Sequence, residues 1–332
     1  MTVSDIGERA LIARLRSRLP RPPASVLVGP GDDAAVLASP ARNERLVVTT
    51  DSIVEGVHVS RAFSSPSDIG HKALAVNLSD LAAMGAAPRW ALVSLVLPGT
   101  WLVSDVEELI DGCAALARRH GVAVVGGNLA RIDGPLVVDI TAGGDVKPRR
   151  WLTRGGARPG DEIHVSGTIG ASTAGLEMLR AGAGPNGVCI ARHRRPVPRV
   201  RLGLAVGRAR AASAAMDLSD GLADAIRQIG AASGCGAVID AAALPIDAEA
   251  RDWWQARGVD PVAAALAGGE DYELLLAVPR RGRGRLQSAR RRVADPALTR
   301  IGEFNREAGS YVVVRGGRAE PLPAGFQHFR QA

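Results

Sequence analysis

Lysine, cysteine and aromatic residues are scarce in this chain, and no long apolar run interrupts it. Three widely spaced cysteines without a CxxC pair exclude a disulfide framework and a thiolate zinc site. No uncharged apolar run of about eighteen residues is present to span a membrane. The N-terminus carries acids where a secretory signal would carry lysines and an apolar segment. We therefore expect a cytoplasmic protein with no membrane partner.

Charge is distributed unevenly within the net +7 of the chain. Residues 1–150 carry sixteen basic and sixteen acidic side chains, and the remainder carries twenty-five and eighteen. Arginine runs at 192–195 and 290–292 could follow a nucleic-acid backbone. However, aromatic residues make up only 3% and offer few stacking platforms for bases. Because Lys72 and Lys147 are the only lysines, coding bias toward arginine explains the runs, and we expect no nucleic-acid partner.

Length and composition predict a folded chain with two domains, since 332 residues exceed one small core and 46% are hydrophobic. Periodicity predicts strands and helices in both halves, which is typical of α/β domains. A segment rich in Arg, Pro and Gly, 146–161, breaks the periodicity. We therefore predict an N-terminal domain over 1–147 and a C-terminal α/β sandwich domain over 148–332. The expected strands are 45–51, 90–97, 122–126, 136–143, 161–167, 237–240, 272–278 and 310–315, and the expected helices are 5–18, 67–85, 103–120, 170–181, 198–213, 219–233, 247–257 and 282–293.

Acidic residues recur in short motifs flanked by apolar residues or glycine. Converging carboxylates without basic partners repel one another, which raises their pKa. Mg²⁺ relieves that repulsion because it prefers oxygen ligands and keeps waters for phosphates. The pattern therefore indicates a magnesium–phosphate site. The motifs are Gly31-Asp32-Asp33, Thr49-Thr50-Asp51, Asn77 with Asp80, Asp217 with Asp220, and Gly269-Glu270-Asp271.

Each motif also has a purely structural interpretation. NLSDLAAMG (77–85) and DLSDGLADA (217–225) both place an acid where a helix is expected to start, so their Ser and Asp residues could be helix N-caps. Gly-Asp-Asp is a common turn, and adjacent threonines favour strands. Glu270-Asp271 could be a solvated strand entry. The joint occurrence of the motifs favours the metal site over these interpretations taken singly.

In order along the chain, the motifs resemble those of the thiamine-monophosphate kinase family, within the superfamily of aminoimidazole ribonucleotide synthetase-like ATP-binding proteins. The resemblance spans nearly the whole chain. It is carried by GDDAAVL (31–37), TTDSIVEGVH (49–58), HKALAVNLSDLAAMGAAP (71–88), VVGGN (124–128), LTRGGARPGD (152–161), MDLSDGLADAI (216–226) and GGEDYELLLAVP (268–279).

This resemblance implies an N-terminal ferredoxin-like ATP-binding domain that pairs with its copy in a homodimer, followed by a second α/β domain. It implies Mg²⁺-dependent transfer of the ATP γ-phosphate to thiamine monophosphate, giving thiamine diphosphate, with several Mg²⁺ ions and a possible monovalent cation. The implied metal ligands are Asp33, Thr49, Thr50, Asp51, Asp80, Asn128, Asp217 and Asp220. The implied ATP contacts are Gly127, Asn128, Arg154 and Ser219, the substrate contacts His58, Glu270 and Phe326, and the catalytic residues Asp51, Asp80, Asp217 and Arg154.

Two positions depart from the family pattern. Asn128 stands where many members carry an acid that binds magnesium, so it offers a carbonyl oxygen without the charge. Pro323 stands where the family usually has Trp, which leaves Phe326 as the aromatic contact. The alternatives are therefore a related kinase with another phosphorylated acceptor, a nucleotide-binding protein weakened at Asn128, and a nucleic-acid binder using the C-terminal arginines.

Overall fold

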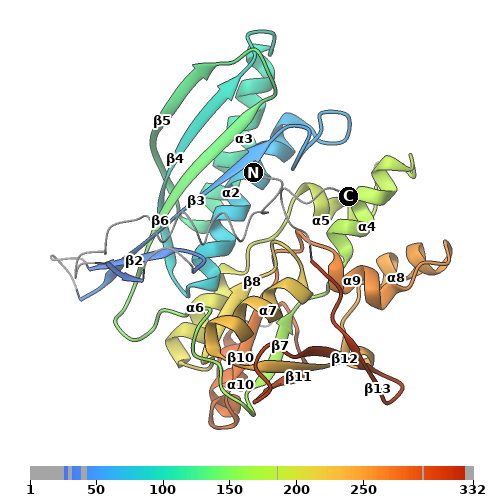
Figure 1. The fold of residues 1–332 in the computed structure, drawn as a ribbon. Helices are drawn as coiled ribbons and strands as arrows, with labels where there is room; N and C mark the ends of the chain where they lie inside the picture. Colours follow the sequence, from blue (N-terminus) through green and yellow to red (C-terminus); the bar gives the residue numbers. More distant parts are fainter. Residues whose placement is uncertain (1–25, 29–31, 39–42, 185, 294, 326–332) are drawn as a thin grey trace, which may run out of the picture.

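The structure is a computed structural model that describes residues 26–28, 32–38, 43–184, 186–293 and 295–325. Its strands form two separate sheets, one from strands up to residue 146 and one from strands after residue 161 (Figure 1). The predicted mixed α/β fold is confirmed, whereas the helix expected over 5–18 lies outside the described residues. Among the described helices, none has both the length and the apolarity needed to cross a bilayer.

The N-terminal sheet has six strands, and all neighbours are antiparallel except β4 and β5. That parallel pair is joined by a helical crossover, as parallel pairing requires. β5 forms one edge of the sheet. In sheet order the strands are β1 (Val26–Val28), β2 (Ala35–Ala38), β3 (Arg45–Val54), β6 (Val137–Val146), β4 (Ala87–Leu97) and β5 (Ala123–Arg131).

Two helices, α2 (Pro66–Ala83) and α3 (Val103–His120), pack on this sheet (Figure 1). α2 begins with a capping box, in which Ser65 and Asp68 satisfy each other's backbone N–H groups. A Cβ at Gly70 would lie 1.8 Å from the Leu109 carbonyl oxygen, and one at Gly112 would lie 2.0 Å from that of Ser67. Glycine is therefore required on both helices, because their backbones touch.

The C-terminal sheet has seven strands, antiparallel except for the pair β9 and β12. In sheet order they are β13 (Arg318–Pro321), β12 (Tyr311–Arg315), β9 (Gly236–Asp240), β11 (Leu298–Asn305), β7 (Glu162–Ser166), β10 (Leu274–Val278) and β8 (Ala214–Asp217). The associated helices are α4 (Ala171–Arg180), α5 (Val188–Arg194), α6 (Val200–Ala209), α7 (Leu222–Ser233), α8 (Ala248–Gln255), α9 (Pro261–Ala267) and α10 (Arg283–Arg292), with short 3₁₀ turns η1 (Ala241–Ala243) and η2 (Arg280–Gly282).

The two halves share a hydrophobic core around α2. Residues of α6, including Val206, belong to the same buried cluster as Leu74 and Leu78 of α2. A Cβ at Gly203 of α6 would lie 2.0 Å from the Ala82 carbonyl oxygen, so these two helices also meet backbone to backbone. Segment 147–161 contains no helix or strand. A domain boundary between 147 and 148 stays a prediction.

Candidate active site

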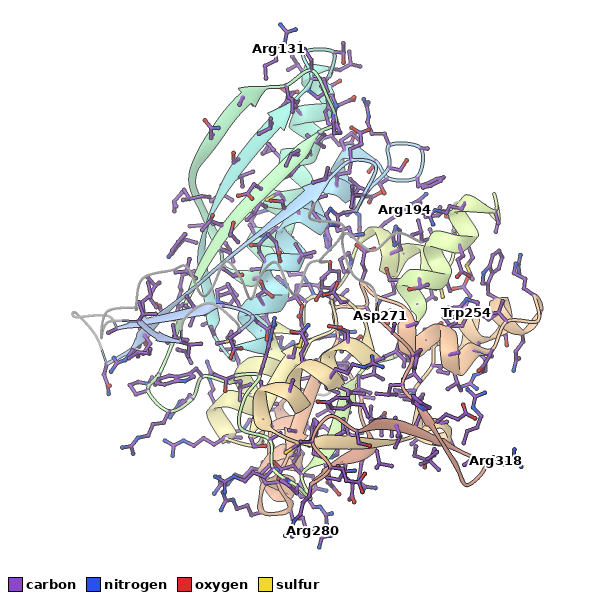
Figure 2. The ribbon with its side chains drawn as sticks, in the orientation of Figure 1. Arg131, Arg194, Trp254, Asp271, Arg280 and Arg318 are labelled. Carbon is purple, nitrogen blue, oxygen red and sulfur yellow. The ribbon has the colours of Figure 1, made fainter. Side chains whose placement is uncertain are left out.

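A cavity of ≈ 690 Å³ lies where the two halves meet. Its wall includes residues of β3, α2 and α4, together with the turn between β8 and α7 and the segment before β10. Asp271, labelled in Figure 2, lies in the segment before β10, between the cavity-lining residues Glu270 and Tyr272. The predicted site residues that line the cavity are Asp33, Thr49, Thr50, Asp51, His58, Asp80, Arg154, Asp217, Ser219, Asp220 and Glu270.

Carboxylates far apart in the sequence converge at one part of the cavity. Asp33, Asp80 and Asp217 each place one oxygen within 4.8 Å of the others. Asp80 Oδ2 accepts a 2.5 Å hydrogen bond from Thr49 Oγ1, and Asp217 Oδ2 accepts one of 2.6 Å from Ser79 Oγ. Asp33 Oδ2 is buried and has no hydrogen-bond partner among the residues that the structure describes. An oxygen-only ligand set with an unsatisfied buried oxygen is suited to a hard cation such as Mg²⁺.

Burial and mutual repulsion raise the pKa values of these carboxyl groups. Burial, followed by the charges of Asp220 and Asp33, raises the pKa of Asp51 to about 6. Burial and the charge of Asp33 raise the pKa of Asp217 to about 8, and burial and Asp51 hold that of Asp80 well above its ordinary value. Divalent cations would keep this cluster ionised at neutral pH.

Asp80 does not lie at a helix start, so the expectation drawn from NLSDLAAMG is wrong. It lies in the last turn of α2, whose N-cap is Ser65, while the N-cap of α7 is Gly221 rather than Ser219 or Asp220. The carbonyl end of a helix carries partial negative charge, which disfavours a carboxylate there. Helix capping therefore does not explain Asp80, and a bound cation would offset this additional repulsion.

The side chains of Thr49, Thr50 and Asp51, which end the motif RLVVTTD, do not all lie on the same face of the sheet. Along β3, alternate side chains face opposite sides of the sheet. Thr49 is buried and contacts Asp80, whereas Thr50 is exposed and its Oγ1 lies 3.2 Å from Thr141 Oγ1 of β6. Thr49 and Asp51 therefore share the face of the acid cluster, and the Thr50 side chain lies on the other face.

Arg154 is the cation closest to the acid cluster in the described contacts. Its Nε donates to Asp33 Oδ1 at 3.0 Å, its Nη2 contacts the same oxygen, and its Nη1 donates to Gln228 Oε1 at 2.6 Å. Its backbone N–H donates to both carboxylate oxygens of Asp32 at 3.2 Å. This fork fixes the guanidinium at the cavity wall, where it can neutralise phosphate charge.

His58 and Glu270, two of the three predicted substrate contacts, also line the cavity. His58 Nδ1 accepts a 3.1 Å hydrogen bond from the Val54 N–H. Glu270 has a left-handed backbone with φ of 64°, which is uncommon for a residue with a side chain. Lys72 Nζ lies 2.7 Å from Glu270 Oε1 and donates to the His58 carbonyl oxygen at 3.0 Å. One buried lysine therefore joins both residues.

The acids that follow Glu270 are structural and buried, so a solvated strand entry is excluded. Asp271 accepts hydrogen bonds from the N–H groups of Gly170 and Ser172, at 2.6 and 3.1 Å, at the start of α4. Glu273 is fully buried and pairs with Arg192 and Arg199. These contacts tie the segment before β10 to its surroundings and hold Glu270 at the cavity.

Comparison with known proteins identifies the family. Models described as AIR synthase related protein match residues 31–146 (N-terminal domain) and 158–315 (C-terminal domain). The thiamine-monophosphate kinase of Escherichia coli (strain K12) is 41% identical, covering 97% of this chain and 98% of that protein. The corresponding enzyme of Bacillus subtilis (strain 168) is 34% identical, covering 92% and 94%. The chain belongs to the thiamine-monophosphate kinase family.

Solved structures agree with this membership of the thiamine-monophosphate kinase family. "AaThiL complexed with AMPPCP and TMP" superposes with a TM-score of 0.85 at 32% identity, covering 99% of both chains. Thiamine-monophosphate kinase from Stenotrophomonas maltophilia K279a gives a TM-score of 0.76 at 40% identity, covering 93% of this chain and 96% of that chain.

Two residues assigned from the thiamine-monophosphate kinase family, Gly127 and Asn128, do not line the cavity, and a third assigned residue lies outside the described part of the chain. Gly127 and Asn128 lie in β5, opposite Val93 and Ser94 of β4, and both are exposed at the sheet edge. Phe326 lies outside the described residues, although its neighbours Ala324 and Gly325 line the cavity. The roles of these three residues stay predictions.

Several residues near the site were not anticipated from the sequence. Thr173 and Arg180 of α4 line the cavity. Ser79 donates a hydrogen bond to Asp217, and Lys72 forms an ion pair with Glu270. The available signal was that Lys72 directly precedes the apolar stretch ALAVNL (73–78), because an ammonium group buried with such a stretch needs a partner. The identity of that partner could not be read from spacing along the chain.

Proposed function

We propose that this chain phosphorylates thiamine monophosphate with ATP, forming thiamine diphosphate and ADP. The observation that carries the proposal is the convergence of Asp33, Asp80 and Asp217 in one cavity with Arg154 beside them. A relative that matches the whole chain was solved with AMPPCP and TMP, which supports both the donor and the acceptor.

The acidic end of the cavity would bind the metal-bound triphosphate. Asp33, Asp51, Asp80 and Asp217, with Asp220 nearby, would hold Mg²⁺ ions that bridge to phosphate oxygens. Thr49 would contribute its hydroxyl, whereas Thr50 could reach the same ions only through its backbone carbonyl. The Mg²⁺ ions would supply charge neutralisation, and Arg154 would add a fixed positive group aimed at the transferring phosphate.

The acceptor is a phosphate rather than a hydroxyl group, and this decides what the protein must do. With a second pKa of about 6, the phosphate monoester is largely a dianion at neutral pH and needs no general base. One of its oxygens forms a bond to the γ-phosphorus while the bond from that phosphorus to the β–γ bridging oxygen breaks, and ADP leaves. His58, Glu270 and Phe326 would orient the acceptor for this in-line transfer. No phosphorylated side chain is formed.

We also propose that the active unit is a homodimer formed through the N-terminal sheet. Within the described part of the chain β5 has a free edge, and its Val124, Val125 and Leu129 are 47%, 60% and 71% exposed. Exposed apolar side chains on an unpaired edge favour association with another strand. A second copy would bring its own Gly127 and Asn128 toward a cavity, which would give these residues access to ATP and metal.

The decisive experiment is a product assay with purified protein, ATP, Mg²⁺ and thiamine monophosphate. We expect thiamine diphosphate and ADP in equal amounts and no acid-stable phosphoprotein during turnover. A panel of other phosphate monoesters tests the alternative of a different acceptor. ATP binding without product, restored to turnover by Asn128→Asp, would instead favour a weakened nucleotide-binding protein. A cytoplasmic location stays a prediction.

A further inference from the structure

Lys72 is a buried charge that the proposed chemistry does not yet use. It lies in the second turn of α2 and is 1% exposed. It is not among the residues that line the cavity. Removing an ammonium group from water is unfavourable unless it is paired and hydrogen bonded. The contacts that Lys72 makes should therefore indicate why the charge is there.

Among the described residues, Lys72 makes polar contacts to two of the three predicted acceptor-binding residues. Lys72 Nζ lies 2.7 Å from Glu270 Oε1 and donates to the His58 carbonyl oxygen at 3.0 Å. His58 belongs to the turn after β3, in the N-terminal half, and Glu270 to the segment before β10, in the C-terminal half. A single ammonium group on a packed helix thus connects the segments that carry His58 and Glu270.

Glu270 depends on such support. Its φ of 64° places it in the left-handed region, which persists in non-glycine residues where the surroundings enforce it. The Glu270 N–H donates to the Ser219 carbonyl oxygen at 2.6 Å, and its Oε2 lies 3.5 Å from His193 Nδ1. Lys72 therefore contributes the closest positive charge to a carboxylate held in a strained backbone position.

We propose that Lys72 is a positioning residue for the phosphate acceptor, fixing Glu270 and the 54–58 turn in the arrangement that binds thiamine monophosphate. The inference rests on the proposed function, because the role of Glu270 and His58 depends on that acceptor. The metal ligands remain intact when Lys72 is replaced, since Asp80 lies two helical turns further along α2. Loss of Lys72 should therefore affect the acceptor and spare the donor.

The test compares the wild-type chain with Lys72→Met, using Lys147→Met as the matched control because Lys147 is exposed and is the other lysine of the chain. We expect Lys72→Met to raise the KM for thiamine monophosphate at least about tenfold and to change the KM for ATP by less than about twofold. Binding of AMPPCP with Mg²⁺, measured by calorimetry, should stay at the wild-type affinity, and Lys147→Met should match the wild type throughout. A purely structural role would instead lower the amount of folded enzyme and leave both KM values unchanged.

A double-mutant cycle with Glu270→Gln keeps the test decisive if Lys72→Met folds poorly, because the double variant removes the whole ion pair. Because Lys72 acts partly through Glu270, adding Lys72→Met to Glu270→Gln should raise the KM for thiamine monophosphate by a clearly smaller factor than Lys72→Met raises it in the wild-type chain. Equal changes in both KM values, or fully additive effects in the cycle, would overturn this inference while leaving the proposed function in place. A wild-type chain that forms no thiamine diphosphate would overturn both.

Discussion

Replacing Asp217 by asparagine should remove a specific pH dependence of stability in the metal-free protein. The carboxyl pKa of Asp217 is raised from 3.8 to about 8, mainly by burial and by the charge of Asp33. Between these two values the folded chain keeps a proton that the unfolded chain has lost. The free energy of unfolding must therefore decrease as the pH rises through this window.

The size of the effect follows from the raised pKa. For one group with a folded pKa of about 8, the free energy of unfolding falls by about 2 kcal/mol between pH 6 and pH 8. The amide of the Asp217→Asn variant would retain an oxygen to accept the hydrogen bond that Ser79 Oγ makes to Asp217 at 2.6 Å. The variant should therefore stay folded and lose about 2 kcal/mol of pH dependence relative to the wild type.

Urea unfolding in EDTA at pH 6, 7 and 8 measures this difference directly. Asp133→Asn is a suitable control, because the Asp133 side chain is 87% exposed. Adding Mg²⁺ should stabilise the wild type more at pH 8 than at pH 6, since cation and proton compete for the same oxygens. Parallel pH dependences for the wild type and Asp217→Asn would refute the argument that Asp217 is protonated in the metal-free cavity.

Further predictions concern the metal, the nucleotide and the dimer. Asp80→Asn should lower kcat/KM at least about a hundredfold by removing a central ligand, and activity recovered at high Mg²⁺ without loss of rate would contradict that role. Arg154→Met should raise the KM for ATP. It should also lower the free energy of unfolding by about 3 kcal/mol, because the Asp33 carboxylate would stay buried without its partner. An unchanged urea midpoint would disprove this stability effect. Asn128→Asp should reduce the Mg²⁺ concentration needed for half-maximal activity. An unchanged Mg²⁺ requirement would show that Asn128 lies away from the metals in the active unit. Leu129→Glu should convert a dimer to monomers in sedimentation, and a wild-type chain that sediments as a monomer would exclude this interface.

The sequence predicted the regular elements well where periodicity was clean. α3 was expected over 103–120 and spans those residues, because its apolar face recurs with helical spacing. β11 was missed, since the bulge between Arg300 and Gly302 shifts the side-chain alternation within the strand. α9 was also missed, because seven residues rich in alanine carry little periodic signal.

The sequence predicted part of the residues that line the cavity, but not their geometry. The ordered motifs brought Asp33, Asp51, Asp80 and Asp217 forward, and all four line one cavity. The orientation of Thr50 away from the acid cluster follows from strand alternation and could have been anticipated. The contact between Lys72 and Glu270 could not, because it depends on how the two halves of the chain pack.

One helix, α2, carries both Lys72, the proposed positioning residue for the acceptor, and Asp80, a proposed metal ligand. Lys72 and Asp80 are separated by eight helical steps, a rise of about 12 Å that the backbone hydrogen bonds of the helix maintain. The helix thus fixes the distance between Lys72, which contacts the proposed acceptor-binding residues, and Asp80, a proposed metal ligand. Inserting one residue between them would turn Asp80 by about 100° around the helix axis, out of the cavity. Accommodation of a longer acceptor would therefore have to come from α4 or from the segment before β10, while the spacing along α2 stays fixed.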